Sequence, residues 1–253
     1  LDPWRDTSFL VDWLGRRDWA QRVAFTGNEI MNVGTLLQYS RDFHDDRRAG
    51  IAVECLLDWL ESHHLDPRTG VWGAVDTTDP IWRSQAVQAA YHWWPLFAYD
   101  DRPYPWVDRA IDTVLLTQNG AGGFGWGVHN PAEPLCSSAC EDIDSIDPLV
   151  RMLGQSWHRR GEVLEVLGRA AEWVLRNQMP DGGFVFLLHR PFEYGHPQLH
   201  GSEGQGAMFP TWFRLLSLAL VASALPEHPL SRIRWQFVRC PGMQFAPPLP
   251  LRS

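Results

Sequence analysis

The sequence predicts an all-α protein, and three observations support this prediction. Apolar residues recur at helical spacing along most of the 253 residues, which is typical of helices that bury one face. No long stretch alternates strictly between apolar and polar residues, so few strands are expected. Two segments of sixteen residues repeat one another, and such repeats indicate stacked helical hairpins.

Helices are expected in seven segments, which are residues 28–43, 47–63, 82–99, 104–118, 148–158, 161–178 and 207–224. Their apolar residues follow roughly helical spacing, as in the first segment with Ile30, Val33, Leu36 and Leu37. We assign residues 1–239 to one helical domain. Residues 240–253 are rich in proline and are expected to form an extended C-terminal segment.

The connections between the expected helices repeatedly place glycine beside an aromatic residue, at 66–73, 118–127 and 178–186. Residues 109–124 and 169–184 match at eight of sixteen positions. Glycine just after a helix end permits a tight turn. We expect the shared glutamines to bond backbone groups at a hairpin end and the shared phenylalanines to pack into the next hairpin. These residues are Gln118, Phe124, Gln178 and Phe184.

Charge and composition restrict the function. The net charge is −8 and every basic residue is arginine, which argues against nucleic acid as a partner. The fourteen tryptophans either fill a helical core or line an aromatic cavity that stabilises positive charge. The apolar run from Leu215 to Leu225 is too short to span a bilayer and no signal peptide is visible, so a cytoplasmic protein is expected.

The four cysteines, at positions 55, 136, 140 and 240, do not suggest a disulfide scaffold. Cys136 and Cys140 follow His129, and a metal site is conceivable there. Their spacing differs from that of common zinc sites, so we expect thiols without a metal.

The stretch ACEDIDSIDPLVRML, residues 139–153, places four acids in front of an apolar segment. In one interpretation, Asp147 caps a helix that starts at Pro148, and Asp142 and Asp144 lie near its positive end. In the other, the crowding of carboxylates keeps one of them protonated for acid catalysis. Both interpretations place the acids in the loop before the helix.

A helix followed by Q-x3-G-G-F, repeated every 50–60 residues, resembles the QW-type repeats of the α/α toroids. This superfamily includes squalene-hopene cyclases, class II diterpene cyclases and the β subunits of protein prenyltransferases. The resemblance covers residues 66–186 and implies an α/α toroid of helical hairpins with QW-like turns. The chain has fewer helices than a closed barrel, so we expect an open toroid, or one completed by a partner domain or a second copy.

The acidic stretch also resembles the D-x-D-D motif of class II terpene cyclases, typically DIDDTA, in which the middle aspartate is the general acid. In this chain Asp142, Ile143 and Asp144 match, Ser145 replaces the last aspartate, and Arg151 falls where the family has an arginine. The resemblance implies that Asp144 protonates an alkene, with help from Asp142 or Ser145. The implied function is acid-initiated cyclisation of an isoprenoid, with no certain cofactor. A diphosphate substrate would require arginine or Mg²⁺.

A carbocation formed in this way needs a dry cavity with aromatic walls. The candidate substrate-binding residues are Trp93, Trp94, Trp126, Trp157, Trp212, Phe213 and Arg214. Arg214 is also a candidate partner for an acid of the cluster, and as a partner it would lower the pKa of that carboxyl group. Three polar residues lie further along the chain, namely His196, His200 and Glu203. They either belong to a Gly-rich loop or reach the same cavity.

Other functions remain open. Paired acids such as Asp142 and Asp144, together with abundant tryptophan, also suit a carbohydrate-active toroid enzyme. A non-catalytic helical repeat that binds a protein or lipid would instead have acids neutralised by arginine and no enclosed cavity. The zinc site of the prenyltransferases fits less well, because its Asp-x-Cys order is reversed in Cys140-x-Asp142.

Overall fold

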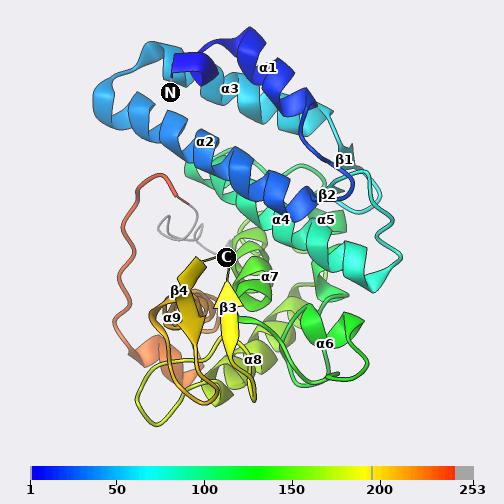
Figure 1. Ribbon diagram of the computed structural model, residues 1–253, viewed down its shortest axis with the longest axis vertical. Coiled ribbons are helices and arrows are strands. Elements are labelled where there is room, and N and C mark those ends of the chain that lie inside the picture. Colours follow the sequence, from blue (N-terminus) through cyan, green and yellow to red (C-terminus); the bar gives the residue numbers. More distant parts are fainter. Residues whose placement is uncertain (1, 195, 243–253) are drawn as a thin grey trace.

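The computed structural model describes residues 2–194 and 196–242, and these residues are mostly helical (Figure 1). The helices are α1 (Thr7–Gly15), α2 (Val23–His44), α3 (Arg47–Ser62), α4 (Pro80–Tyr99), α5 (Val107–Leu115), α6 (Trp126–His129), α7 (Ala139–Met152), α8 (Arg160–Arg176) and α9 (Met208–Ala224), with 3-10 helices at Asp2–Arg5 and Pro229–Arg232. Antiparallel hairpins pair β1 (Leu65–Asp66) with β2 (Val71–Trp72) and β3 (Phe192–Tyr194) with β4 (His196–Gly201). The predicted all-α class with few strands is confirmed.

No helix in the described part of the chain is long and apolar enough to cross a membrane. Most of the Pro-rich segment 240–253 lies outside the described residues, because the description ends at Gly242.

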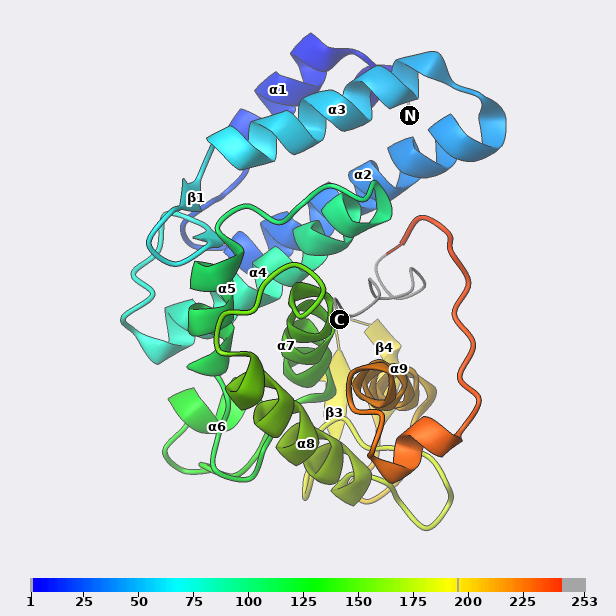
Figure 2. The ribbon, with the colours of Figure 1, turned by 180° about the vertical axis from the view of Figure 1, so that it is seen from behind.

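The main helices alternate along the chain between two rows. Helices α2, α4, α7 and α9 pack side by side in this order, and we call them the inner row. Helix α3 packs against α2, α5 against α4 and α7, and α8 against α7 and α9. Figure 2 shows α5 and α8 beside α7 when the molecule is seen from behind. Helix α7 therefore lies between other helices on several sides.

The helix expected at 148–158 is α7, and it begins much earlier than the apolar pattern predicts. Ser138 is its N-cap, because the Ser138 hydroxyl accepts a hydrogen bond from the backbone N–H of Glu141 (3.2 Å). The predicted capping role of Asp147 is wrong. Asp147 lies inside the helix, where its carboxylate pairs with Arg151 one turn later. The four acids thus belong to the helix and not to a preceding loop.

The two repeated turns have the same hydrogen-bond pattern. The side-chain amide of Gln118 donates to the carbonyl of Gly122 (3.0 Å), and that of Gln178 donates to the carbonyl of Gly182 (3.2 Å). A backbone bridge joins each glutamine to the phenylalanine that closes its turn, and both phenylalanines are buried. The predicted backbone hydrogen bonds of Gln118 and Gln178 are confirmed. The packing of Phe124 and Phe184 into the next hairpin stays a prediction.

Part of the tryptophan surplus fills the core around α4. Trp72, Trp93 and Trp94 are fully buried. The ring of Trp72 meets the edge of Trp93 at a centroid distance of 5.3 Å and that of Trp94 at 6.3 Å. Trp93 and Trp94 thus fill the interior, where their rings pack against other rings.

Candidate functional site

A cavity of about 440 Å³ lies between the four helices of the inner row and β3. Asp144 of α7 lines it, and most of the remaining wall is aromatic or apolar. Rings reach it from α2, α4, β3 and α9, namely Phe25, Tyr91, Tyr194, Phe209, Trp212 and Phe213. The inner row therefore brings an acid and several aromatic rings together from distant parts of the sequence.

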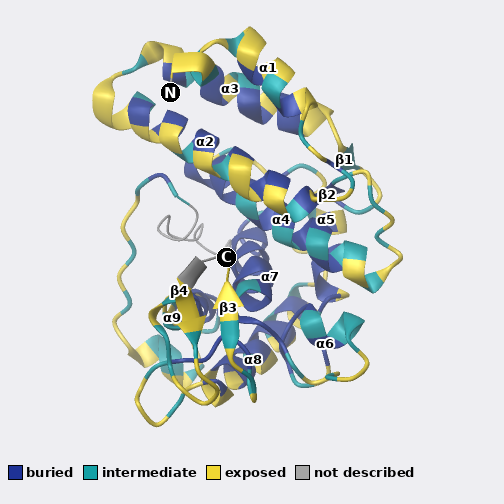
Figure 3. Ribbon diagram, in the orientation of Figure 1, coloured by how far each residue is buried: buried dark blue, intermediate teal, exposed yellow. Residues whose placement is uncertain are grey.

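Helix α7 carries its acids through the interior. All residues from Glu141 to Met152 are buried, and Figure 3 shows the helix dark blue along most of its length. A carboxylate without a partner is costly in such surroundings, because burial removes its hydration. Each acid of α7 must therefore be paired, hydrogen-bonded or protonated.

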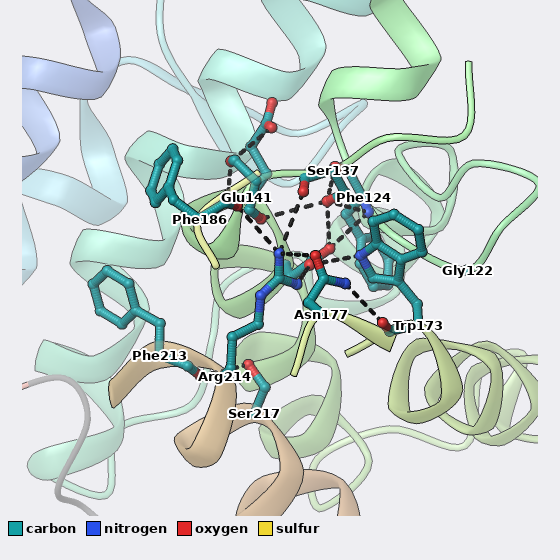
Figure 4. A network of polar contacts seen from close by, with 12 residues as sticks. Gly122, Phe124, Ser137, Glu141, Trp173, Asn177, Phe186, Phe213, Arg214 and Ser217 are labelled. Carbon is teal, nitrogen blue, oxygen red and sulfur yellow. Dashed lines mark hydrogen bonds and ion pairs between the residues drawn. The ribbon is translucent and has the colours of Figure 1, made fainter. Parts of the chain in front are cut away.

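Asp142 is paired with Arg214 of α9, and both side chains are completely buried. Figure 4 shows Arg214 beside Ser137 and Asn177 in the surrounding network of polar contacts. The Asp142 carboxylate also accepts hydrogen bonds from the hydroxyl of Ser137 (2.5 Å), the backbone N–H of Phe124 (2.9 Å) and the indole of Trp173 (3.0 Å). Burial raises the pKa of Asp142, while Arg214 and these donors oppose the increase. This network ties α7 to α8, α9 and the first repeated turn.

The remaining donors of Arg214 are directed at the protein interior. Its Nη2 donates to the side-chain oxygen of Asn177 (3.1 Å) and to the backbone carbonyls of Ser137 and Phe186 (both 3.3 Å). The expected pairing of Arg214 with an acid of the cluster is confirmed, and the acid is Asp142. The structure places Arg214 in this network and not on the wall of the cavity.

Asp147 has an arginine of its own. Its carboxylate pairs with Arg151, and both side chains are almost completely buried. Burial raises the pKa of Asp147, and the charge of Arg151 opposes this increase. Two of the buried aspartates thus have a guanidinium partner each.

Asp144 has no such partner. Its carboxyl group receives no hydrogen bond and no ion pair from any described residue, and its side chain faces the cavity. Burial raises the pKa of Asp144 well above its ordinary value of 3.8, and the nearby acids Glu141, Asp142 and Asp147 raise it further. Burial and the neighbouring acids therefore favour the protonated form of Asp144, which faces an aromatic cavity.

Neighbouring polar groups in the cavity wall carry no positive charge. His92 is bonded through Nδ1 to the backbone carbonyl of Gln88 (2.6 Å), and burial lowers its pKa to about 4. Tyr194 is hydrogen-bonded to the thiol of Cys140, and burial raises the pKa of Tyr194 to about 12. Burial also raises the pKa of Cys140 well above its ordinary value. These groups leave Asp144 without a cation in the described wall.

A second cavity of about 390 Å³ adjoins the first. Both are lined by Ala24, Phe25, Gln88, Cys140 and Tyr194, so the two cavities share part of their wall. Glu141 is the acid of the second cavity. Its carboxylate accepts hydrogen bonds from the hydroxyls of Ser138 (2.8 Å) and Ser84 (3.2 Å), and it contacts Nε2 of His129 (3.2 Å).

The structure separates the aromatic residues proposed from the sequence. Trp212 and Phe213 line the cavity of Asp144, and Trp126 lines the second cavity. Trp157 is 60% exposed, stacks on the guanidinium of Arg160 and lines neither cavity. Trp93 and Trp94 line neither cavity. Ser145 is buried in α7 next to Asp144 in sequence, but it does not line the cavity.

Sequence reasoning missed several residues of this wall, namely Phe25, Tyr91, His92, Tyr194 and Phe209. Tyr91 and His92 lie in α4, which is apolar on most sides, so the sequence did not indicate which face of this helix would meet α7. The start of α7 did have a signal, because S-x-x-E at Ser138–Glu141 is the pattern of a capping box.

His200 and Glu203, which were proposed from the sequence to reach a common cavity, do not line the cavity of Asp144. His200 is exposed and pairs with Glu193 in the β3–β4 hairpin, and Glu203 is exposed in the following turn. The side chain of His196 lies outside the described residues. The four cysteines are not joined in disulfides, and no group of three or more metal-binding side chains is found among the described residues.

Comparisons of this chain with protein-family models, with curated proteins and with solved structures found no match. The function is therefore inferred from the site itself.

Proposed function

We propose that the protein is an acid-initiated isoprenoid cyclase in which Asp144 is the proton donor. One observation carries this proposal. Of three buried aspartates on α7, two are paired with arginine, and the third, Asp144, faces an aromatic cavity without such a partner. A helix that served only as a scaffold has no need of an unpaired acid at this place.

The reaction follows from the groups in the wall. The carboxyl group of Asp144 donates its proton to a carbon of a terminal alkene, whose π electrons form the new C–H bond. This step leaves a tertiary carbocation and the Asp144 carboxylate. An internal alkene then attacks the cation and closes a ring. The last cation then loses a proton to water, or adds water and releases a proton, and the Asp144 carboxylate takes up a proton from solvent for the next turnover.

The aromatic rings of the wall can stabilise the carbocation that this reaction forms. Faces of Tyr194, Trp212 and Phe213 carry negative π density, which stabilises a passing cation without acting as a nucleophile. Trp212 and Phe213 stack on each other with a centroid distance of 4.9 Å, so each ring helps to hold the other in place.

The helix arrangement supports an open α/α toroid as the finer description of the fold. Inner-row and outer helices alternate along the chain, and the cavity is lined by the inner row. We propose that the described helices form an arc of helical hairpins around this cavity. A partner domain or second copy that closes the arc is part of the same proposal.

A carbohydrate-active site built on Asp142 and Asp144 receives less support. Such a mechanism needs both carboxyl groups at the substrate. The Asp142 carboxylate is instead occupied by Arg214, Ser137 and Trp173, and it does not line the cavity.

The test is a product assay on wild type and the Asp144→Asn variant. Each is incubated with geranylgeraniol, geranylgeranyl diphosphate, farnesyl diphosphate and squalene, with and without Mg²⁺, and cyclic products are sought by mass spectrometry. The variant is expected to lose about 100-fold or more in rate, because amide replaces the only proposed acid. Equal product from both folded proteins, or none from wild type with any isoprenoid, would reject the proposal.

A further inference from the structure

The two adjoining cavities have different acids. Asp144 lines the first cavity, where six aromatic rings surround it. Glu141 lines the second cavity, together with hydrogen-bonding side chains that include Gln21, Ser84, Gln85 and His129. A ligand that extended through both cavities would therefore have one end at Asp144 and the other beside Glu141.

The acid determines the direction in which such a ligand lies. The alkene that receives the proton must reach Asp144, so the hydrocarbon end occupies the aromatic cavity. The polar end then extends past Tyr194 and Cys140, which line both cavities, toward Gln85 and Glu141. The two cavities thus distinguish the tail of the substrate from its head.

The charges around the polar end disfavour an anion. Glu141 is buried there, and its carboxylate is held by Ser84, Ser138 and His129. Arg22 is the arginine in the described wall of the second cavity. It is exposed, and its guanidinium lies over the ring of Phe25 at 4.9 Å from the centroid. The sequence has no lysine that could add to it.

A diphosphate carries several negative charges and is normally bound by clustered arginines, lysines or Mg²⁺. Here it would meet a buried carboxylate instead. The amides of Gln85 and Gln88 and the carboxylate of Glu141 together donate and accept hydrogen bonds, as a hydroxyl group requires.

We infer that the substrate is an isoprenoid with an uncharged polar head, such as a prenyl alcohol, and that this head binds beside Glu141. The inference rests on the proposed function for the orientation of the chain. It goes beyond that function by choosing the class of head group.

Binding separates this inference from catalysis. The dissociation constants of geranylgeraniol and geranylgeranyl diphosphate, which share one hydrocarbon tail, are measured by quenching of tryptophan fluorescence in the presence of EDTA and again with Mg²⁺. The alcohol is expected to bind about tenfold or more tightly, because a like charge opposes the diphosphate at short range. Equal or tighter binding of the diphosphate, with or without Mg²⁺, would overturn the inference, as would failure of both to bind.

A charge-removing variant gives the second arm. Glu141→Gln is expected to reduce the ratio of the two dissociation constants, diphosphate to alcohol, by about fivefold or more. The reason is that the diphosphate gains affinity when the carboxylate is lost. The matched control is Glu203→Gln, which removes an exposed carboxylate away from both cavities and should leave the ratio unchanged. An unchanged ratio in folded Glu141→Gln would overturn the inference. The wild-type ratio still decides if that variant does not fold.

The two proposals can fail separately. Tighter binding of the alcohol without any cyclic product would support the head-group inference and reject the proposed cyclase. Cyclic product from a diphosphate that binds more tightly than the alcohol would do the reverse.

Discussion

The guanidinium of Arg214 in α9 pairs with the carboxylate of Asp142 in α7, and neither side chain is exposed to solvent. Asp144 lies two residues after Asp142 in the same helix. Because Arg214 is directed at Asp142, its charge does not neutralise the acid at the cavity. Asp142 and the candidate catalytic acid Asp144 thus lie on one helix, but only Asp142 has Arg214 as its counterion.

Arg214→Met is expected to destabilise the protein by about 3–5 kcal/mol, because it leaves the Asp142 carboxylate buried without a counterion. The free energy of unfolding is measured by urea denaturation. Arg16→Met is the control, since Arg16 forms an exposed pair with Asp12 whose loss should cost about 1 kcal/mol or less. Similar losses in the two variants would contradict the role assigned to Arg214.

The raised pKa of Asp144 predicts how stability depends on pH. Between the ordinary value of 3.8 and its folded-state pKa, Asp144 binds more protons in the folded protein than in the unfolded chain. Its contribution to stability is therefore full at low pH and is lost as the pH rises through this interval.

Asp144→Asn removes this loss, because an amide does not titrate. The stability of the variant relative to wild type should increase as the pH is raised above about 4. Denaturation of both proteins at a series of pH values measures the difference, with Asp12→Asn as an exposed control. A difference that stays constant or decreases with pH would show that Asp144 is ionised in the folded protein.

Two tryptophans proposed from the sequence provide a matched pair. Trp212 lines the cavity of Asp144, whereas Trp157 is mostly exposed and lines neither cavity. Trp212→Leu should lower the rate of cyclisation about three- to thirtyfold, since a cation–π contact contributes about 0.5–2 kcal/mol. Trp157→Leu should retain the wild-type rate. Equal rates for both variants would remove Trp212 from the proposed wall.

The repeated turns provide a second matched pair, Gly122 and Gly182. Both have positive φ, at 100° and 87°, so alanine is strained at either position by about 1–2 kcal/mol. At Gly122 a Cβ atom would also lie 2.5 Å from the backbone oxygen of Arg169, while at Gly182 it would meet no atom within 4 Å. Gly122→Ala should therefore lower the melting temperature more than Gly182→Ala. The reverse order would contradict the packing of this turn against α8.

Several features could be predicted from the sequence because they depend on local interactions. Helix-period apolar patterns located α2, α3, α4, α5, α8 and α9, although the boundaries shifted by a few residues. The Q-x3-G-G-F turns formed as expected, since glutamine, glycine and phenylalanine act within one turn.

The start of α7 was mispredicted for an identifiable reason. Proline is common in the first turn of a helix, so Pro148 after Asp147 resembled a helix start. Proline also removes a backbone hydrogen bond, and its position inside a helix is uncommon. Here the Ser138 cap and the tertiary contacts of a fully buried helix outweigh that cost.

The sequence by itself determined the helical class, the repeated turns and the presence of an acid-rich segment, because spacing and turn chemistry are local properties of the chain. Only the tertiary structure decided which acid is neutralised. Asp142, Asp144 and Asp147 are similar in sequence, but their charge states depend on partners that come from other parts of the fold or from the opposite face of α7. Arg214 reaches Asp142 across the helix packing, whereas Asp144 meets aromatic rings. Burial raises the pKa of a carboxyl group and a neighbouring cation opposes that rise, so the balance at each acid depends on the packed structure.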